Sequence, residues 1–183
     1  LRSENEKVKE AAMTIQSPLS VGLFAGKWCS YAATPDLPHD QREEDGGALV
    51  FDTLPLQEPM QLLGAAQVTL DLATDTPVAM AAVRLSSVAP DDKATRITYG
   101  ILNLTHREGS KNPHPLTPGK RYRVTIRCNE MAQTLPPGYR LRLSISTSYW
   151  PLAWPAPKPA RLNIFAGSST LQLPLRPAKS EDD

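Results

Sequence analysis

The chain has 183 residues, of which 40% are hydrophobic and 21% are charged, and its formal net charge is +1. This composition is typical of a globular protein and excludes an intrinsically disordered one. A near-neutral charge without a long basic run argues against nucleic-acid binding, which depends on phosphate contacts. No apolar run reaches the roughly 20 residues that span a bilayer. We therefore expect one domain with its own core and no membrane partner.

Residues 1–13 are polar and rich in good helix formers, so we expect an N-terminal extension with at most a short, fraying helix. They do not form a signal sequence, and the chain starts with Leu1, so we expect a piece of a longer or processed protein. Cys29 and Cys128 are too few for a disulfide framework and have no zinc spacing. We expect both thiols to be reduced and buried, in a cytoplasmic protein.

Residues 14–45 show little periodicity, so they predict a long irregular N-terminal segment. A loop of this length in a compact domain is either functional or packed against a partner. Its inner part carries apolar side chains that are unusual in a loop, namely Leu23, Phe24, Trp28 and Tyr31. Its outer part, residues 36–45, is acidic but lacks the alternating spacing of a calcium loop. We expect a solvated, partly salt-bridged turn without a metal, and calcium binding remains the weaker alternative.

Short apolar runs separated by prolines follow, as expected for strands joined by turns. Residues 64–74, 121–128 and 138–146 alternate with period 2, which predicts strands with one buried face. Residues 78–88 are apolar on both faces at first, which predicts a central strand covered on both sides. Other strands are expected at 48–51, 96–105 (with a bulge or close approach at Gly100), 160–166 and 170–175.

About eight short strands without a strong helical stripe predict an all-β fold. The most fitting architecture is a jelly-roll β-sandwich over residues 14–177, followed by a charged tail at residues 178–183.

The strand at 138–146 leads into a block of aromatic residues and prolines at 149–155. Because proline lacks a backbone donor, this block should leave the sheet and run over its edge. Two interpretations stay open for its aromatic side chains and Trp28. They form a sugar-stacking platform, or they fill the sandwich end or an interface, and the second is favoured because aromatic residues dominate both places. The side chains concerned are Trp28, Tyr149, Trp150 and Trp154.

The sequence does not show the nucleophile, base and acid that a serine hydrolase requires. The nearest match to GxSxG, around Gly167-Ser168, lacks the second glycine. The three histidines, His39, His106 and His114, occupy loop-like or strand-end positions. We therefore predict no catalytic residue, metal or cofactor in this chain, and no activity of the chain by itself.

Six stretches, considered together and in order, resemble one known family. They are residues 40–42 (DQR), 48–56 (ALVFDTLPL), 83–91 (VRLSSVAPD), 99–107 (YGILNLTHR), 137–143 (PGYRLRL) and 149–151 (YWP). The resemblance is to the C-terminal domain of X-prolyl dipeptidyl-peptidases and cocaine-esterase-like (CocE/NonD) serine hydrolases. It implies a jelly roll similar to galactose-binding domains. It also implies a parent acyl esterase or X-Pro dipeptidyl-peptidase, whose Ser, Asp and His lie on an α/β-hydrolase domain outside this chain.

The chain departs from the family pattern at two turns. It has Tyr139 between Gly138 and Arg140, where the family often has histidine, so we expect no role for a histidine there. It has Asp92 after Pro90-Asp91, where the family often has glycine, and we expect little effect from this change.

From these observations we expect a non-catalytic domain that packs on the α/β-hydrolase domain of the same polypeptide and helps shape its active-site entrance. The alternative is a stand-alone carbohydrate- or ligand-binding jelly roll. An exposed docking face also leaves a homo-oligomer open. The residues expected to face the partner domain or its pocket are Leu23, Phe24, Trp28, Tyr31, Tyr149, Trp150 and Trp154.

Overall fold

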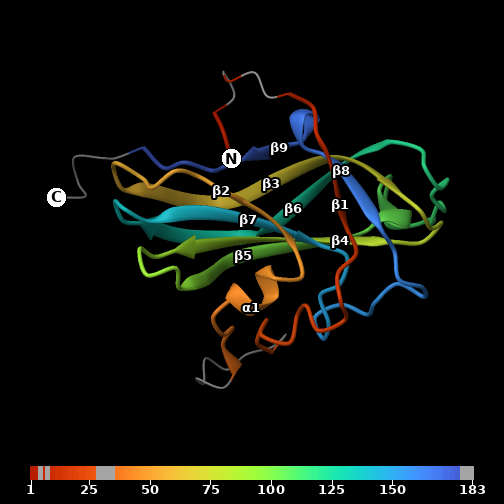
Figure 1. Cartoon of the computed structure of the whole chain (residues 1–183), viewed down its shortest axis with the longest axis horizontal. Helices are drawn as coiled ribbons and strands as arrows, with labels where there is room; N and C mark the ends of the chain where they lie inside the picture. The colour runs from red at the N-terminus through yellow and green to blue at the C-terminus, as the bar shows by residue number, and fades with distance from the viewer. Residues whose placement is uncertain (4–5, 7–8, 28–35, 178–183) are drawn as a thin grey trace.

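The computed structural model describes residues 1–3, 6, 9–27 and 36–177. In this part, the chain forms two antiparallel sheets packed face to face as a β-sandwich (Figure 1). Sheet A has the strand order β1-β8-β3-β6, with β9 also paired to β3. Its strands are β1 (Ala12–Ile15), β3 (Met60–Thr74), β6 (Tyr122–Leu135), β8 (Leu162–Phe165) and β9 (Thr170–Gln172).

Sheet B has the order β2-β7-β4-β5. Its strands are β2 (Leu49–Asp52), β4 (Met80–Val88), β5 (Ala94–Asn103) and β7 (Arg140–Ser146). One short helix, α1 (Arg42–Asp45), precedes β2, and 3-10 turns follow β5 and β8 at η2 (Leu104–His106) and η3 (Ala166–Ser168). The all-β sandwich predicted from the sequence is confirmed.

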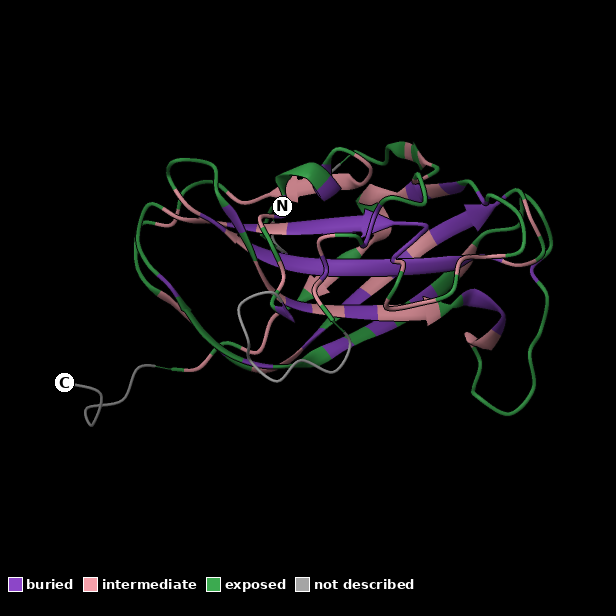
Figure 2. Cartoon of the chain, turned by 90° about the horizontal axis from the view of Figure 1, so that it is seen from below, coloured by how far each residue is buried: buried purple, intermediate pink, exposed green. Residues whose placement is uncertain are grey.

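The main core lies between the sheets and is built from alternate residues of each strand. In β6, Val124, Ile126 and Cys128 are buried, whereas Thr125 and Arg127 between them are exposed. Figure 2 shows buried residues concentrated in the central strands and exposed residues in the loops. Burial raises the pKa of the Cys128 thiol to about 11, so it is neutral near pH 7. The predicted burial of Cys128 is confirmed, and Cys29 lies outside the described residues.

Strand β4 lies in the middle of sheet B, between β7 and β5. Every residue of β4 except Ser87 is buried. Alternate residues face opposite sides, so both faces of this strand must be covered. The prediction of a central strand with two covered faces is confirmed.

The outer face of sheet B is covered by the chain's own irregular segment, residues 17–27 and 36–45, which we term the covering segment. Val21 and Ala25 of this segment form a second apolar cluster with Met80, Ala82 and Tyr149. Figure 1 shows α1 lying against sheet B, on the side away from β9. The irregular N-terminal segment is therefore packed on this domain's own sheet.

Because of this cover, one prediction for β7 was wrong. The alternation at residues 138–146 predicted a strand with one buried face, but Ser144 and Ser146, on the face expected to meet solvent, are also buried. Serine is small, and its hydroxyl can form a hydrogen bond with another group inside the protein. Ser144 Oγ donates to Asp45 Oδ1 at 2.7 Å, and Ser146 Oγ donates to Ser148 O at 2.9 Å.

Several element boundaries differ from the predictions. The described part of residues 1–13 contains no helix, and β1 forms instead because residues 12–15 pair with β8. Strands β3 and β6 both extend further than predicted, and they pair with each other from Met60↔Leu135 to Leu72↔Tyr122. The irregularity between Ala65 and Gln67 shifts their register without ending the pairing.

Gly100 lets β5 lie close to β6 along one side of the sandwich. A Cβ atom on Gly100 would lie 2.7 Å from the Arg127 carbonyl oxygen and 2.9 Å from Ile126 Cγ2. Nearby, Thr98 Oγ1 donates to the Asn129 carbonyl at 2.8 Å. The predicted close approach at Gly100 is confirmed.

We predict that Gly100→Ala destabilises the domain by about 1–3 kcal/mol, because the added methyl group overlaps backbone that cannot rotate away. The free energy of unfolding from denaturant titration measures this. Gly46→Ala is the control, since Gly46 has an ordinary helical φ of −61° and is exposed. Equal unfolding free energies for the two variants would contradict the prediction.

Candidate functional site

A buried cluster of charged side chains joins the covering segment to sheet B. Arg84 of β4 forms a close contact through Nη1 with Glu44 Oε2, and its Nη2 lies 3.1 Å from Asp45 Oδ1. The side chains of Arg84 and Glu44 are each only 1% exposed. The acidic run at 36–45 was predicted to be a solvated, partly salt-bridged turn. Its salt bridges are present, but solvation is wrong for Asp36, Glu44 and Asp45, which are buried. Arg84 draws the carboxylates of Glu44 and Asp45 into the interior.

The cluster continues toward the surface through Arg142 of β7. Arg142 Nη1 lies 3.0 Å from Asp45 Oδ2, and its Nε and Nη2 each lie 2.7 Å from a carboxylate oxygen of Asp52. The hydrogen bonds from Arg142 hold the pKa of Asp52 below its ordinary value. Positive and negative groups therefore alternate from Arg84 outward, and this pairing is what makes burial of these charges tolerable.

At the rim of the cluster, Arg140 contacts both Asp52 and Asp92. Asp92 has a φ of 67°, in the left-handed region that glycine adopts without strain. A glycine, which the resemblance implies at this turn, would fit that backbone conformation. Here aspartate accepts the strained φ and adds a carboxylate beside Arg140.

The exposed apolar side chains of the covering segment lie next to the aromatic corner, residues 149–155. We call this surface the loop–corner face, and it consists of Leu19, Leu23, Phe24, Leu37, Trp150 and Trp154. Leu23 is 61% exposed and Trp154 is 82% exposed, whereas Phe24 and Trp150 are half-buried. Two of the seven residues predicted to face a partner, Trp28 and Tyr31, lie outside the described residues.

Tyr149 does not belong to this face, and the prediction that it is available to a partner was wrong. Its side chain is fully buried, its ring lies 5.6 Å from the ring of Tyr99, and its hydroxyl accepts a hydrogen bond from Arg96 Nη1 at 2.7 Å. Burial raises its pKa. Tyr149 instead anchors the corner on the outer face of sheet B.

The two halves of the loop–corner face are in backbone contact. A Cβ atom on Gly22 would lie 2.1 Å from the Trp150 carbonyl oxygen, so only glycine allows the chain to pass there. Gly22 also has a positive φ of 118°. The peptide between Trp150 and Pro151 is cis. The covering segment and the aromatic corner are therefore direct neighbours, with Leu23 next to Gly22 in the chain.

The tryptophan rings of the corner do not form a flat platform. The rings of Trp150 and Trp154 lie 4.8 Å apart with their planes inclined by 57°. Trp154 also lines a hollow of about 290 Å³ between residues 153–157 and the ends of β4 and β5. Apart from Asn103, the side chains around this hollow are apolar, so it suits an apolar group better than a sugar.

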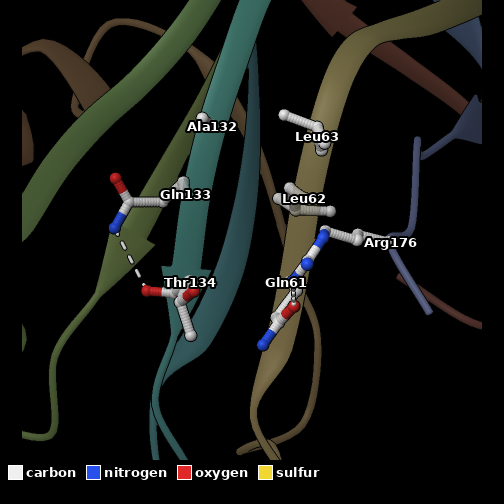
Figure 3. A pocket seen from close by; sticks show the side chains of 7 residues that line it. All are labelled: Gln61, Leu62, Leu63, Ala132, Gln133, Thr134 and Arg176. Atoms are coloured by element: carbon white, nitrogen blue, oxygen red, sulfur yellow. Dashed lines mark hydrogen bonds between the residues drawn. The ribbon is translucent and has the colours of Figure 1, made fainter. Parts of the chain in front are cut away.

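A second hollow, of about 350 Å³, lies on sheet A at the ends of β3 and β6 (Figure 3). It is lined by Gln61, Leu62, Leu63, Ala132, Gln133, Thr134 and Arg176. Arg176 Nη1 donates to Gln61 Oε1 at 2.8 Å, and Gln133 Nε2 donates to the Thr134 carbonyl at 3.1 Å. The Arg176 and Gln61 side chains thus bond to each other and Gln133 bonds to the backbone, and none of the predicted site residues lies there.

The three histidines are dispersed. The His39 ring packs beside Phe24, His106 Nδ1 is 3.3 Å from the Gly109 carbonyl, and His114 Nδ1 is 2.9 Å from Glu108 Oε2. Among the described residues, no hydrogen bond joins a histidine to a serine, and no three His, Cys, Asp or Glu side chains are arranged to hold a metal. No helix in the described ranges is long and apolar enough to cross a membrane.

Residues 2–178 match the model of the X-Pro dipeptidyl-peptidase C-terminal non-catalytic domain. The cocaine esterase of Rhodococcus sp. (strain MB1 Bresler) is 27% identical over 116 residues, which are 62% of this chain and 20% of that protein. The chain thus spans about a fifth of the length of this curated relative.

Two solved structures share the fold. An alpha-amino acid ester hydrolase superposes with a TM-score of 0.76 at 23% identity, over 90% of this chain and 32% of that one. An aminopeptidase from the marine sediment archaeon Thaumarchaeota archaeon gives a TM-score of 0.73 at 21% identity, over 93% and 34%. At these identities, the superpositions establish the sandwich architecture.

We predict that Arg84→Met destabilises the chain by about 3–5 kcal/mol, because Glu44 and Asp45 lose their buried cation. Adding Glu44→Gln should recover part of this loss, since glutamine is neutral and still accepts the hydrogen bond from the Phe24 amide. Denaturant unfolding of the two variants measures this. A double variant less stable than Arg84→Met would contradict the explanation.

We also predict that Asp52 contributes to acid sensitivity. Its folded pKa is lowered from 3.8, so its stabilising contribution is present above that pH and is lost as the pH falls below it. Asp52→Asn should therefore be less stable at neutral pH and should show a shallower fall in unfolding free energy below pH 3.8. Denaturant titrations from pH 7 to pH 2 test this, and parallel curves for the two proteins would refute it.

Proposed function

Because this chain belongs to the X-Pro dipeptidyl-peptidase C-terminal non-catalytic domain family, we propose that it is the accessory β-sandwich of a serine hydrolase. The parent enzyme would be an acyl esterase or an X-Pro dipeptidyl-peptidase. In this proposal, the catalytic residues lie on an α/β-hydrolase domain of the same polypeptide. The chain's coverage of only 20% of the cocaine esterase supports such a larger protein.

The loop–corner face is the surface proposed to pack on the hydrolase domain. This proposal is supported by the strong exposure of Leu23 and Trp154 and by the approach of Gly22 to the Trp150 backbone, which makes their two segments neighbours. Contiguous apolar surface of this kind is typical of interfaces, in which aromatic side chains are enriched. The isolated chain, with this face free, could also self-associate.

We further propose that the same face helps shape the active-site entrance. Its residues come from irregular segments held on a rigid sheet, the usual arrangement for residues that contact ligands. The apolar hollow beside Trp154 would then form one wall of that entrance. The inclined tryptophan rings give less support to the alternative, a free-standing sugar-binding module.

The test uses a protein in which this chain is joined to its native hydrolase domain. We predict that Leu23→Ser and Trp154→Ser each weaken the interdomain contact by more than about 1 kcal/mol, as for central interface residues. The two domains should then unfold in separate steps, and the KM for a substrate ester should change. Scanning calorimetry and ester kinetics measure these effects.

Leu54→Ser is the matched control, since Leu54 is 85% exposed but lies between β2 and β3, outside the loop–corner face. If all three variants behave alike, the docking proposal fails. Saturable glycan binding by the 183-residue chain, abolished by Trp154→Ser, would favour the sugar-binding module instead.

A further inference from the structure

The exposed loop of the loop–corner face is held from inside the domain. The Phe24 amide donates to Glu44 Oε1 at 2.7 Å, and the Phe24 carbonyl accepts from Gln41 Nε2 at 3.0 Å and from the His39 amide at 3.0 Å. Gln41 is fully buried and Glu44 is 2% exposed. The direction of the neighbouring Leu23 side chain therefore depends on two buried residues of the covering segment.

Both of these residues are bound by Arg84. Its Nη1 contacts Glu44 Oε2 and donates to Gln41 Oε1 at 3.2 Å, while its Nη2 donates to Asp45 Oδ1. A guanidinium group presents several donors in one rigid plane, so a single side chain fixes all three acceptors at once. Lysine at this position would keep the charge but could not hold the same geometry.

Arg84 also lies beside the other half of the face. Its guanidinium carbon is 5.7 Å from the centre of the buried Tyr149 ring, and Tyr149 directly precedes Trp150. A cation near an aromatic ring is attracted to it. One side chain at the centre of sheet B thus contacts the supports of both the exposed loop and the corner.

We propose that Arg84 is a positioning residue that sets the loop–corner face for docking, acting through Gln41 and Glu44 on the loop and through Tyr149 on the corner. This inference rests on the proposed docking function and adds the interior group that pre-organises it. Arg84 is 1% exposed and touches no partner domain itself. A pre-ordered surface loses less conformational freedom on binding, which strengthens the contact.

The first experiment follows amide hydrogen exchange in the 183-residue chain. In Arg84→Lys, the Phe24 amide should exchange at least about tenfold faster, because local opening of the loop becomes easier. The amides that pair β4 with β7 should keep their protection. If Arg84→Lys does not fold, Gln41→Met removes the hydrogen bonds that link Arg84 to the Phe24 carbonyl, without changing any charge.

Ser86→Ala is the matched control. Ser86 lies two residues from Arg84 on β4, is buried, and its hydroxyl has no hydrogen-bond partner among the described residues. Its removal should leave the exchange of Phe24 unchanged. Unchanged exchange of Phe24 in both Arg84→Lys and Gln41→Met would overturn the proposal, as would equal loss of protection throughout β4, which indicates a purely structural role.

The second experiment uses the protein with its hydrolase domain and separates this inference from the proposed function. In Arg84→Lys, as in Leu23→Ser, the two domains should unfold in separate steps, whereas in Ser86→Ala they should not. If Leu23→Ser has no effect, the docking face itself is wrong, whatever the exchange of Phe24. If Leu23→Ser separates the domains and Arg84→Lys does not, the docking face stands and the positioning role of Arg84 is refuted.

Discussion

The buried contact between Arg84 and Glu44 determines how the covering segment lies on sheet B. Removing a carboxylate and a guanidinium from water is costly unless each finds an opposite charge and further hydrogen bonds in good geometry. Gln41 and Asp45 are additional acceptors for Arg84, and the Phe24 amide donates to Glu44. Asp45 in turn accepts from Arg142 and Ser144. An ionic contact of this kind favours one arrangement over others more clearly than apolar packing does, because a shifted segment would leave charges unpaired. The small apolar cluster around Val21 and Ala25 then needs only to fill the remaining space.

The strands of the sandwich were largely readable from alternation and proline spacing, because the main core uses one face of each strand. The second buried face could not be read in this way, since Ser144 and Ser146 resemble surface residues. Their partners lie 99 residues away or just beyond the end of β7. The sequence did contain one indication of this second buried face, namely Arg84. A charged residue inside a run predicted to be covered on both sides requires a buried counter-charge, and the acidic run at 36–45 could supply it. In the corner, the sequence could not predict that Tyr149 is buried and Trp154 is exposed. The burial of each side chain depends on where the chain leaves the sheet.

The paired strands and the loop–corner face occupy different parts of the chain. The paired strands hold the architecture that it shares with hydrolases at 21–23% identity, whereas the loop–corner face consists of residues outside the sheets. Packing between the sheets restricts core residues to apolar side chains of suitable volume. The exposed side chains of the covering segment face no such restriction, although the backbone beneath them is fastened at Gly22 and Phe24. Substitutions of these exposed side chains should therefore leave the sandwich core unchanged.

The close approach at Gly100 also bears on aggregation. β5 and β6 are the terminal strands of their sheets, and a terminal strand presents unpaired backbone groups to which another chain can add. Here these two strands lie against each other, and Thr98 bonds directly to a β6 carbonyl that would otherwise be free. This side of the sandwich is therefore shielded from growth by strand addition.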